Sequence, residues 1–246
     1  MSDARNHEDE KELAKNELVL ETIKCLRKGG PRIEKERRSD ILFITGCTST
    51  KSETSEKEAA YKRYIGKASQ GMLNFFGTFH QKKKRLLDLY VLSAGYGFIP
   101  ADSCIQKYDV SFNNVNAVLR GKMAQRLAVG EDFQDLLNLG YKLVILRLGS
   151  NYIKALKDVA QNGYNVLKNT KVCCLKTKSE KTCKKLLHSD DLKGIEVNET
   201  DQRINGGKIP YQDRIWSKFF EKNKDASTDE IIQKINSAKN VKELMK

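Results

Sequence analysis

The chain has 246 residues, of which 39% are apolar and 31% charged, and it holds only 16 Gly and 3 Pro. This composition excludes low-complexity disorder, a collagen-like repeat and a coiled-coil rod, and it leaves a globular protein with a sizeable core. A net charge of +13 favours a polyanionic partner such as nucleic acid, and solubility alone is the plain alternative.

The first 40 residues predict a helical N-terminal extension and a linker (1–40). Residues 8–28 mix charged residues with apolar residues at helical spacing, and Gly29-Gly30-Pro31 ends the helix. A polar run leads from there to Asp40. Residues 41–46 are then continuously apolar except at their end, which is typical of a buried strand in a parallel sheet.

A second helix is expected after this strand. Ser55-Glu56-Lys57-Glu58 matches a capping box, in which the serine and the glutamate satisfy free backbone N–H groups. The apolar positions that follow recur every fourth residue, at Ala60, Tyr64, Ala68, Met72 and Phe76. Residues 89–94 predict the next strand, and the loop after it holds Gly95, Gly97 and Pro100.

The same alternation continues along the chain. Residues 116–139 predict one or two helices, and Gly140 is well placed to end the last of them by adopting a positive φ. Residues 143–148 predict a third strand. Ser150 is the expected cap of a further helix that runs to residue 163.

Strands that alternate with helices predict the fold class. Residues 171–175 indicate a fourth strand, and a second capping box at residues 227–230 begins a helix in the C-terminal part. We therefore expect an α/β fold, with a mostly parallel wound sheet flanked by helices and an additional helical C-terminal part. The predicted units are an α/β domain over 41–190 and a mostly helical extension over 191–246.

Three loops at strand ends carry the residues expected to bind a ligand. Residues 46–52, 93–97 and 149–152 combine glycines, hydroxyls and small residues, and the carboxyl ends of parallel strands meet at one edge of the sheet. Tight strand-to-helix turns require the same residue types, which is the alternative. The predicted binding residues are Thr48, Ser49, Ser93, Tyr96, Gly97, Tyr108, Ser150 and Asn151.

Candidate reacting groups lie in or near these loops. Lys51 and Cys47 follow the first strand, where a helix start and a lysine can make a thiol nucleophilic, although a structural thiol is the favoured interpretation of Cys47. Asp109 stands near Tyr96 and Tyr108, and a carboxylate beside an aromatic shelf can stabilise a glycosyl cation or act as a base. A packed aromatic residue before a turn-forming aspartate is the alternative.

The sequence lacks the motifs of several other reactions and sites. The phosphate-loop pattern requires a second glycine where this chain has Thr50, so we do not expect NTP hydrolysis. Cys173, Cys174 and Cys183 with His188 lack any C-x-x-C pair, so no metal site is expected. No triad or zinc-hydrolase motif surrounds the three histidines, and the residues imply no cofactor.

The sequence also predicts a cytoplasmic protein with no membrane partner. No window approaches the apolar length of a spanning helix, and the first ten residues are acidic rather than signal-like. Six cysteines are too few for a disulfide scaffold and are expected to be thiols.

Two lysine-rich runs are candidate contacts to a phosphate backbone. One comprises Lys82, Lys83 and Lys84, and the other holds seven lysines between Lys168 and Lys185. Such contacts give affinity and salt dependence without reading the base sequence. Solvated charged faces are the alternative.

The order of motifs over residues 41–156 resembles the YaaA peroxide-stress family and the similar domain of archaeosine synthase. The resemblance rests on the turn 48–51, the stretch 91–99, the stretch 105–108 and the stretch 148–156. Motif positions of that family fall on Lys51, Ser93, Tyr96, Gly97, Tyr108, Ser150, Asn151 and Tyr152. This chain departs from the family in lacking the proline of the turn and in having Asp109 where peroxide-stress members carry a basic residue.

The resemblance implies an α/β fold and an activity on nucleic acid, in a stress response or in base modification such as tRNA modification. The leading hypothesis is therefore a protein that binds DNA or tRNA. A nucleobase- or nucleoside-processing enzyme, such as an N-glycosylase or a base-exchange enzyme, is the second hypothesis. A non-catalytic subunit that docks on a protein partner in a modification complex is the third.

Overall fold

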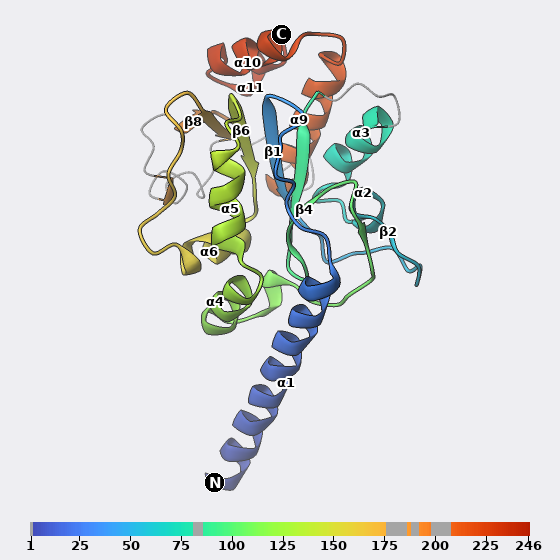
Figure 1. Cartoon of the computed structure of the whole chain (residues 1–246), viewed down its shortest axis with the longest axis vertical. Helices are drawn as coiled ribbons and strands as arrows, with labels where there is room; N and C mark the ends of the chain where they lie inside the picture. The colour runs from blue at the N-terminus through green and yellow to red at the C-terminus, as the bar shows by residue number, and fades with distance from the viewer. Residues whose placement is uncertain (1, 81–85, 176–185, 188–191, 198–207) are drawn as a thin grey trace.

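A computed structural model of the chain describes residues 2–80, 86–175, 186–187, 192–197 and 208–246. The chain begins with the long helix α1 (Ser2–Gly29), whose N-terminal half projects from the body (Figure 1). Burial increases along this helix, from exposed Leu13 to fully buried Ile23. Its C-terminal half is therefore the part that packs.

A six-stranded sheet forms the centre of the molecule, in the order β4-β3-β1-β6-β7-β8. Every neighbouring pair is parallel except β3 with β4. The strands are β1 (Ile41–Gly46), β3 (Asp88–Ser93), β4 (Gly97–Pro100), β6 (Leu143–Arg147), β7 (Lys171–Leu175) and β8 (Leu192–Ile195). The first five of these carry long runs of buried residues, as strands covered on both faces require.

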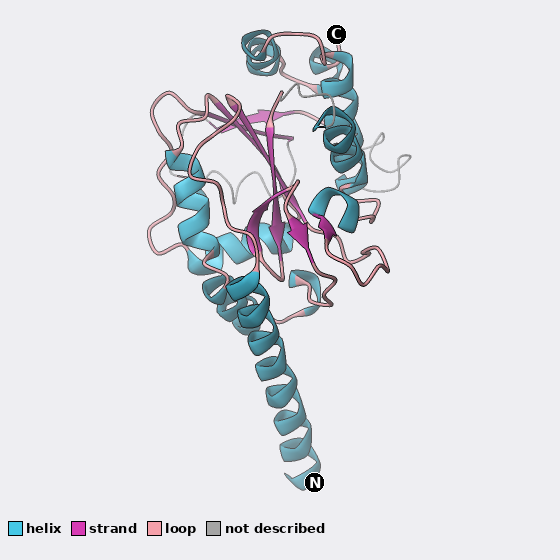
Figure 2. Cartoon of the chain, turned by 45° about the vertical axis from the view of Figure 1, so that its right-hand side comes forward, coloured by secondary structure: helices cyan, strands magenta, loops and turns pink. Residues whose placement is uncertain are grey.

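Helices cover both faces of this sheet, as Figure 2 shows edge-on. On one face, Phe43 of β1 packs edge-on against Trp216, with ring centres 6.0 Å apart. On the other face, Phe98 of β4 stacks on Phe133 at 5.7 Å. The first face carries α3 (Gln70–His80) and α9 (Lys208–Lys222), and the second carries α4 (Ala117–Arg126), α5 (Val129–Asn138) and α6 (Ser150–Val159).

Smaller elements complete the fold. Two short strands, β2 (Glu58–Ala59) and β5 (Cys104–Ile105), pair antiparallel outside the main sheet. The remaining short elements are α2 (Ala60–Arg63), the 3-10 helix η1 (Phe112–Asn114), α10 (Thr228–Ser237) and α11 (Val241–Leu244). None of the helices in the described part of the chain combines the length and apolar composition that spanning a bilayer requires.

The predicted α/β class with a helical C-terminal part is confirmed, as are the predicted strands over 41–46 and 171–175. The helical region 116–139 forms α4 and α5, and Gly140 follows with φ +75°. The predicted capping box at Ser227 is present, with Glu230. These elements depend on residues close together in the sequence.

The helix predicted from Ser55 is wrong. Glu58 belongs to β2, and its carboxylate pairs with Arg63 at 3.1 Å and accepts from the Ser52 hydroxyl, so it does not cap the backbone of Ser55. The long helix begins only at Gln70, where Asp213 of α9 accepts the N–H of Gly71 at 2.6 Å. Tertiary partners have replaced the local cap.

Three smaller expectations are also corrected. The loop expected after β3 is a tight turn into the edge strand β4, with Gly97 at φ +78°. The cap of α6 is Gly149 rather than Ser150, and α6 ends at Val159. Strand β8 adds a parallel strand beyond residue 190, and the described residues from 208 onward are mostly helical, as expected.

Candidate functional site

The candidate site lies at the point where the order of the parallel strands reverses. Among the parallel strands the order is 2-1-3-4-5, because β1 has β3 on one side and β6 on the other. In sheets of this order, the loop after β1 and the loop after β6 leave the sheet toward opposite faces. Ligands bind in the crevice between two such loops. Figure 2 shows most strand arrowheads directed toward the end of the molecule from which α1 projects.

Hydrogen bonds hold the three predicted loops together at this edge. The N–H of Cys47 donates to the carbonyl of Leu92 at 3.0 Å, which ties the loop after β1 to β3. The hydroxyl of Tyr152, on α6, donates to the carbonyl of Cys47 at 2.7 Å. The predicted convergence of residues 46–52, 93–97 and 149–152 is therefore present.

Cys47 is a packed thiol in this arrangement. Its sulfur lies 3.1 Å from the Tyr152 oxygen and 3.4 Å from the backbone nitrogen of Ala94, and the residue is buried. Since Tyr152 uses its one hydroxyl proton on the carbonyl of Cys47, the thiol hydrogen donates to the Tyr152 oxygen. The geometry favours the structural interpretation of Cys47 over the nucleophilic one.

A chain of buried hydroxyls forms the floor of the site. Ser93 lies 2.7 Å from the Tyr108 hydroxyl, which lies 2.9 Å from that of Tyr64. The Ser93 oxygen also accepts the N–H groups of Gly95 and Tyr96, so it shapes the turn after β3. Burial raises the pKa of Tyr64 and that of Tyr108 well above the usual value for tyrosine, so both stay protonated at neutral pH.

Lys51 lies on this floor. Its ammonium nitrogen is 4.4 Å from the centre of the Tyr108 ring and 3.5 Å from the Ser49 carbonyl oxygen, and only 7% of the residue is exposed. Burial lowers the pKa of Lys51, and the neighbouring Cys47 and Asp109 partly oppose this shift. A lysine with a lowered pKa can act as an acid, a base or a nucleophile.

Exposed polar groups surround the floor as a rim, which comprises Ser49, Thr50, Asp109 and Ser150. Ser150 and the partly buried Asn151 open α6, and Asn151 donates to Asn113 at 3.1 Å. Thr48 is not available to a ligand, because its hydroxyl donates to the Thr50 carbonyl at 2.7 Å and accepts the Gly66 N–H.

The predicted stacking shelf is closed. Tyr96 and Tyr108 are buried and meet edge-on, with ring centres 5.5 Å apart. Lys51 covers the face of the Tyr108 ring, and a Cβ on Gly95 would come within 2.7 Å of that ring. These tyrosines therefore build the floor, and a base cannot stack on Tyr108.

Arg63 is a residue that the sequence did not single out. Its guanidinium is fully buried and donates to the carbonyl oxygens of Ser52, Thr54, Glu56 and Ile105. It thereby fixes the loop that follows Lys51. Tyr64, expected only as an apolar helix position, forms an isolated bridge with Lys51 through its backbone. No local pattern marks either role, because their partners lie on other elements.

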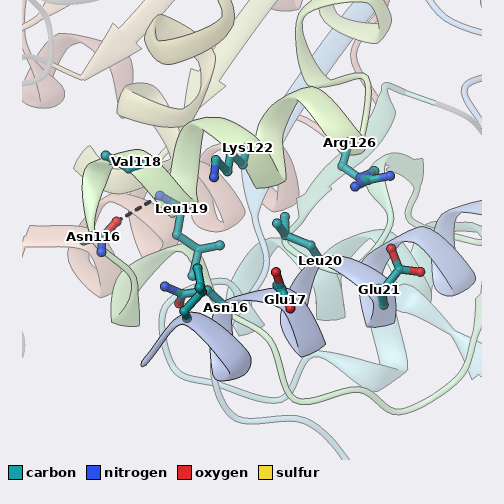
Figure 3. A pocket seen from close by; sticks show the side chains of 10 residues that line it. Asn16, Glu17, Leu20, Glu21, Asn116, Val118, Leu119, Lys122 and Arg126 are labelled. Carbon is teal, nitrogen blue, oxygen red and sulfur yellow. Dashed lines mark hydrogen bonds between the residues drawn. The ribbon is translucent and has the colours of Figure 1, made fainter. Parts of the chain in front are cut away.

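A groove between α1 and α4 lies apart from this floor (Figure 3). It encloses about 440 Å³, and Leu20 of α1 and Leu119 of α4 point into it. Glu21 and Arg126 stand at one end. Leu13 and Val118, which also line it, are more than half exposed.

The C-terminal end of α1 packs against the candidate site. Arg27 is buried, donates to the carbonyl of Tyr96 at 2.8 Å and pairs with Asp132 of α5 at 2.5 Å. A Cβ on Gly30 would come within 2.4 Å of the Tyr96 ring, so the end of this helix lies directly against the turn after β3.

Most of the predicted phosphate contacts lie outside the part of the chain that the structure describes. Lys82, Lys83 and Lys84, and five of the seven lysines between 168 and 185, lie outside the described residues; Lys168 and Lys171 are exposed. Within the described ranges, no group of three or more His, Cys, Asp or Glu side chains could hold a metal ion.

One family profile matches the chain. It is described as a family of unknown function (DUF6884) and covers residues 41–173, more than half of the 246 residues. The matched stretch contains the floor, the rim and Arg63. No curated protein and no solved structure matches the chain.

Proposed function

The chain belongs to DUF6884, a family of unknown function, and from its site we propose that it is an enzyme that cleaves or exchanges an N-glycosidic bond. Its substrate is a nucleoside, or a nucleoside unit within DNA or tRNA. The observation that carries this proposal is the burial of Lys51 against the Tyr108 ring at the carboxyl edge of the sheet, with Asp109 close enough to affect its pKa.

The two groups have complementary roles. When the C1′–N bond breaks, its electron pair leaves with the base, and positive charge develops on the sugar. The exposed carboxylate of Asp109 stabilises that charge, and the Lys51 ammonium gives its proton to the departing base nitrogen. Water or an incoming base then adds at C1′, and the proton it loses returns to Lys51. The neutral tyrosines of the floor keep water from the Lys51 side.

Nucleic acid is proposed as the source of the base. The net charge of +13 raises the local concentration of polyanions. The motif order that resembles the YaaA family and the domain of archaeosine synthase supports the same class of partner, in base modification or in a stress response.

The test is base release from nucleosides, single-stranded DNA and tRNA. We expect Asp109→Asn and Lys51→Met to reduce release at least 100-fold while melting temperature and tRNA affinity stay near the wild-type values. Asp225→Asn and Lys218→Ala, which change exposed residues far along the chain, are the matched controls. Wild-type release by Asp109→Asn would refute the proposed mechanism.

A further inference from the structure

A hollow between α2 and α3 shares one wall with the candidate site. It encloses about 580 Å³, a volume typical of small-molecule sites. Tyr64 lines it, and the same side chain reaches Tyr108 on the floor at 2.9 Å. The backbone of Tyr64 also pairs with that of Lys51. Tyr64 therefore separates the hollow from the floor that holds Lys51, and a ligand in the hollow would contact the residue that the two share.

Two carboxamides face this space from one helix. Gln70 and Asn74 are four residues apart on α3, which places them on the same side. Both are exposed, and within the described part of the chain neither carboxamide has a hydrogen-bond partner. Each offers a donor and an acceptor side by side, which is the pattern that pairs with the edge of a nucleobase, adenine above all.

An aromatic ring and a cation complete the lining. The Tyr61 ring lies against Gly77 of α3, where a Cβ would come within 2.7 Å of it. The Lys62 ammonium lies 5.8 Å from the centre of that ring. No carboxylate is among the described residues that line the hollow, so its chemistry suits a planar, uncharged or anionic ligand.

We propose that the α2–α3 hollow is the subsite that holds the nucleobase, with Gln70 and Asn74 on its edge and with Tyr61 and Lys62 in its wall. The sugar would then lie toward Tyr64 and Lys51. This inference rests on the proposed function for the identity of the substrate, but binding tests it separately from turnover.

The experiment is equilibrium dialysis of the full chain with adenosine, guanosine, cytidine and uridine. We expect adenosine to bind best, and Asn74→Asp and Gln70→Glu each to weaken it about 10-fold, because a carboxylate keeps the acceptor and loses the donor. Thr78→Val is the matched control. Thr78 lines the same hollow, but its hydroxyl already donates to the backbone carbonyl of Asn74 at 3.0 Å.

The outcomes separate this subsite from the proposed reaction. Unchanged binding in both carboxamide variants, equal weakening by Thr78→Val, or no nucleoside binding at millimolar concentration overturns the subsite. Base release that survives Asp109→Asn, together with carboxamide-dependent binding, overturns the reaction and leaves the subsite standing. Gly77→Ala gives an independent check, because its Cβ would displace the Tyr61 ring and should weaken binding, with folding followed by the melting temperature.

Discussion

The Lys51 side chain lies in a place that water scarcely reaches, and burial lowers its pKa. Its ammonium has an aromatic ring below it and one carbonyl beside it, and its exposed fraction is 7%. Proteins seldom bury a lysine without an ion pair at contact distance, because the charged form loses hydration. That cost is tolerated where a lysine has a chemical role, which is why Lys51 is a stronger candidate than the packed thiol of Cys47.

The lowered pKa of Lys51 predicts its reactivity. A larger fraction of neutral amine is present at any given pH, so the pH midpoint for acylation of Lys51 should lie below the usual value for a lysine side chain. Acetylation followed by mass spectrometry across a pH series measures this midpoint. A midpoint at or above the usual lysine value would contradict this interpretation of the site.

At the scale of elements, local signals predicted some parts of the fold and failed at others. Strand β1 and the cap of α10 depend on neighbouring residues, and both were predicted. The start of α3 depends on Asp213, 142 residues after Gly71, so a local capping motif at Ser55 was misleading. The convergence of the three loops followed from the parallel order of strands alone. The role of Arg63 could not be predicted, because it exists only once α2 lies beside its loop.

Helix α1 is attached to the body through a buried ion pair. Burial raises the pKa of Asp132 to about 7, so this carboxyl group can take up a proton when its cation is removed. We therefore expect Arg27→Met to destabilise the protein by about 1–3 kcal/mol, which is less than the cost of a buried charge that stays unpaired. It also removes the donor to the Tyr96 carbonyl and should lower base release through the turn after β3. Chemical denaturation measures the first effect.

Two further variants make this prediction specific. Lys28→Met removes a neighbouring exposed cation and should change stability by less than about 0.5 kcal/mol. The double variant Arg27→Met with Asp132→Leu should recover part of the loss, since no buried charge remains unpaired. A double variant as unstable as the sum of two single variants would show that the pair is not coupled.

At the scale of the whole molecule, the positive charge predicts how salt should affect the proposed binding of nucleic acid. If the lysine-rich runs contact phosphates, affinity for tRNA and DNA should fall by about 10³ or more between low and moderate salt. Replacing Lys82, Lys83 and Lys84 by serine should reduce the slope of log K against log salt by about 2 to 3. Filter binding across a salt series measures this slope, and affinity that is independent of salt would leave the charge without a role in binding.

The attachment of α1 also has a consequence for the order of folding during synthesis. The partners of Arg27, Tyr96 and Asp132, lie 69 and 105 residues further along the chain. At roughly 5–20 residues per second, Arg27 is synthesised about 5–20 s before Asp132. The helix is therefore synthesised well before the residues on which it packs, and its apolar side at Ile23 has no native packing partner during that interval.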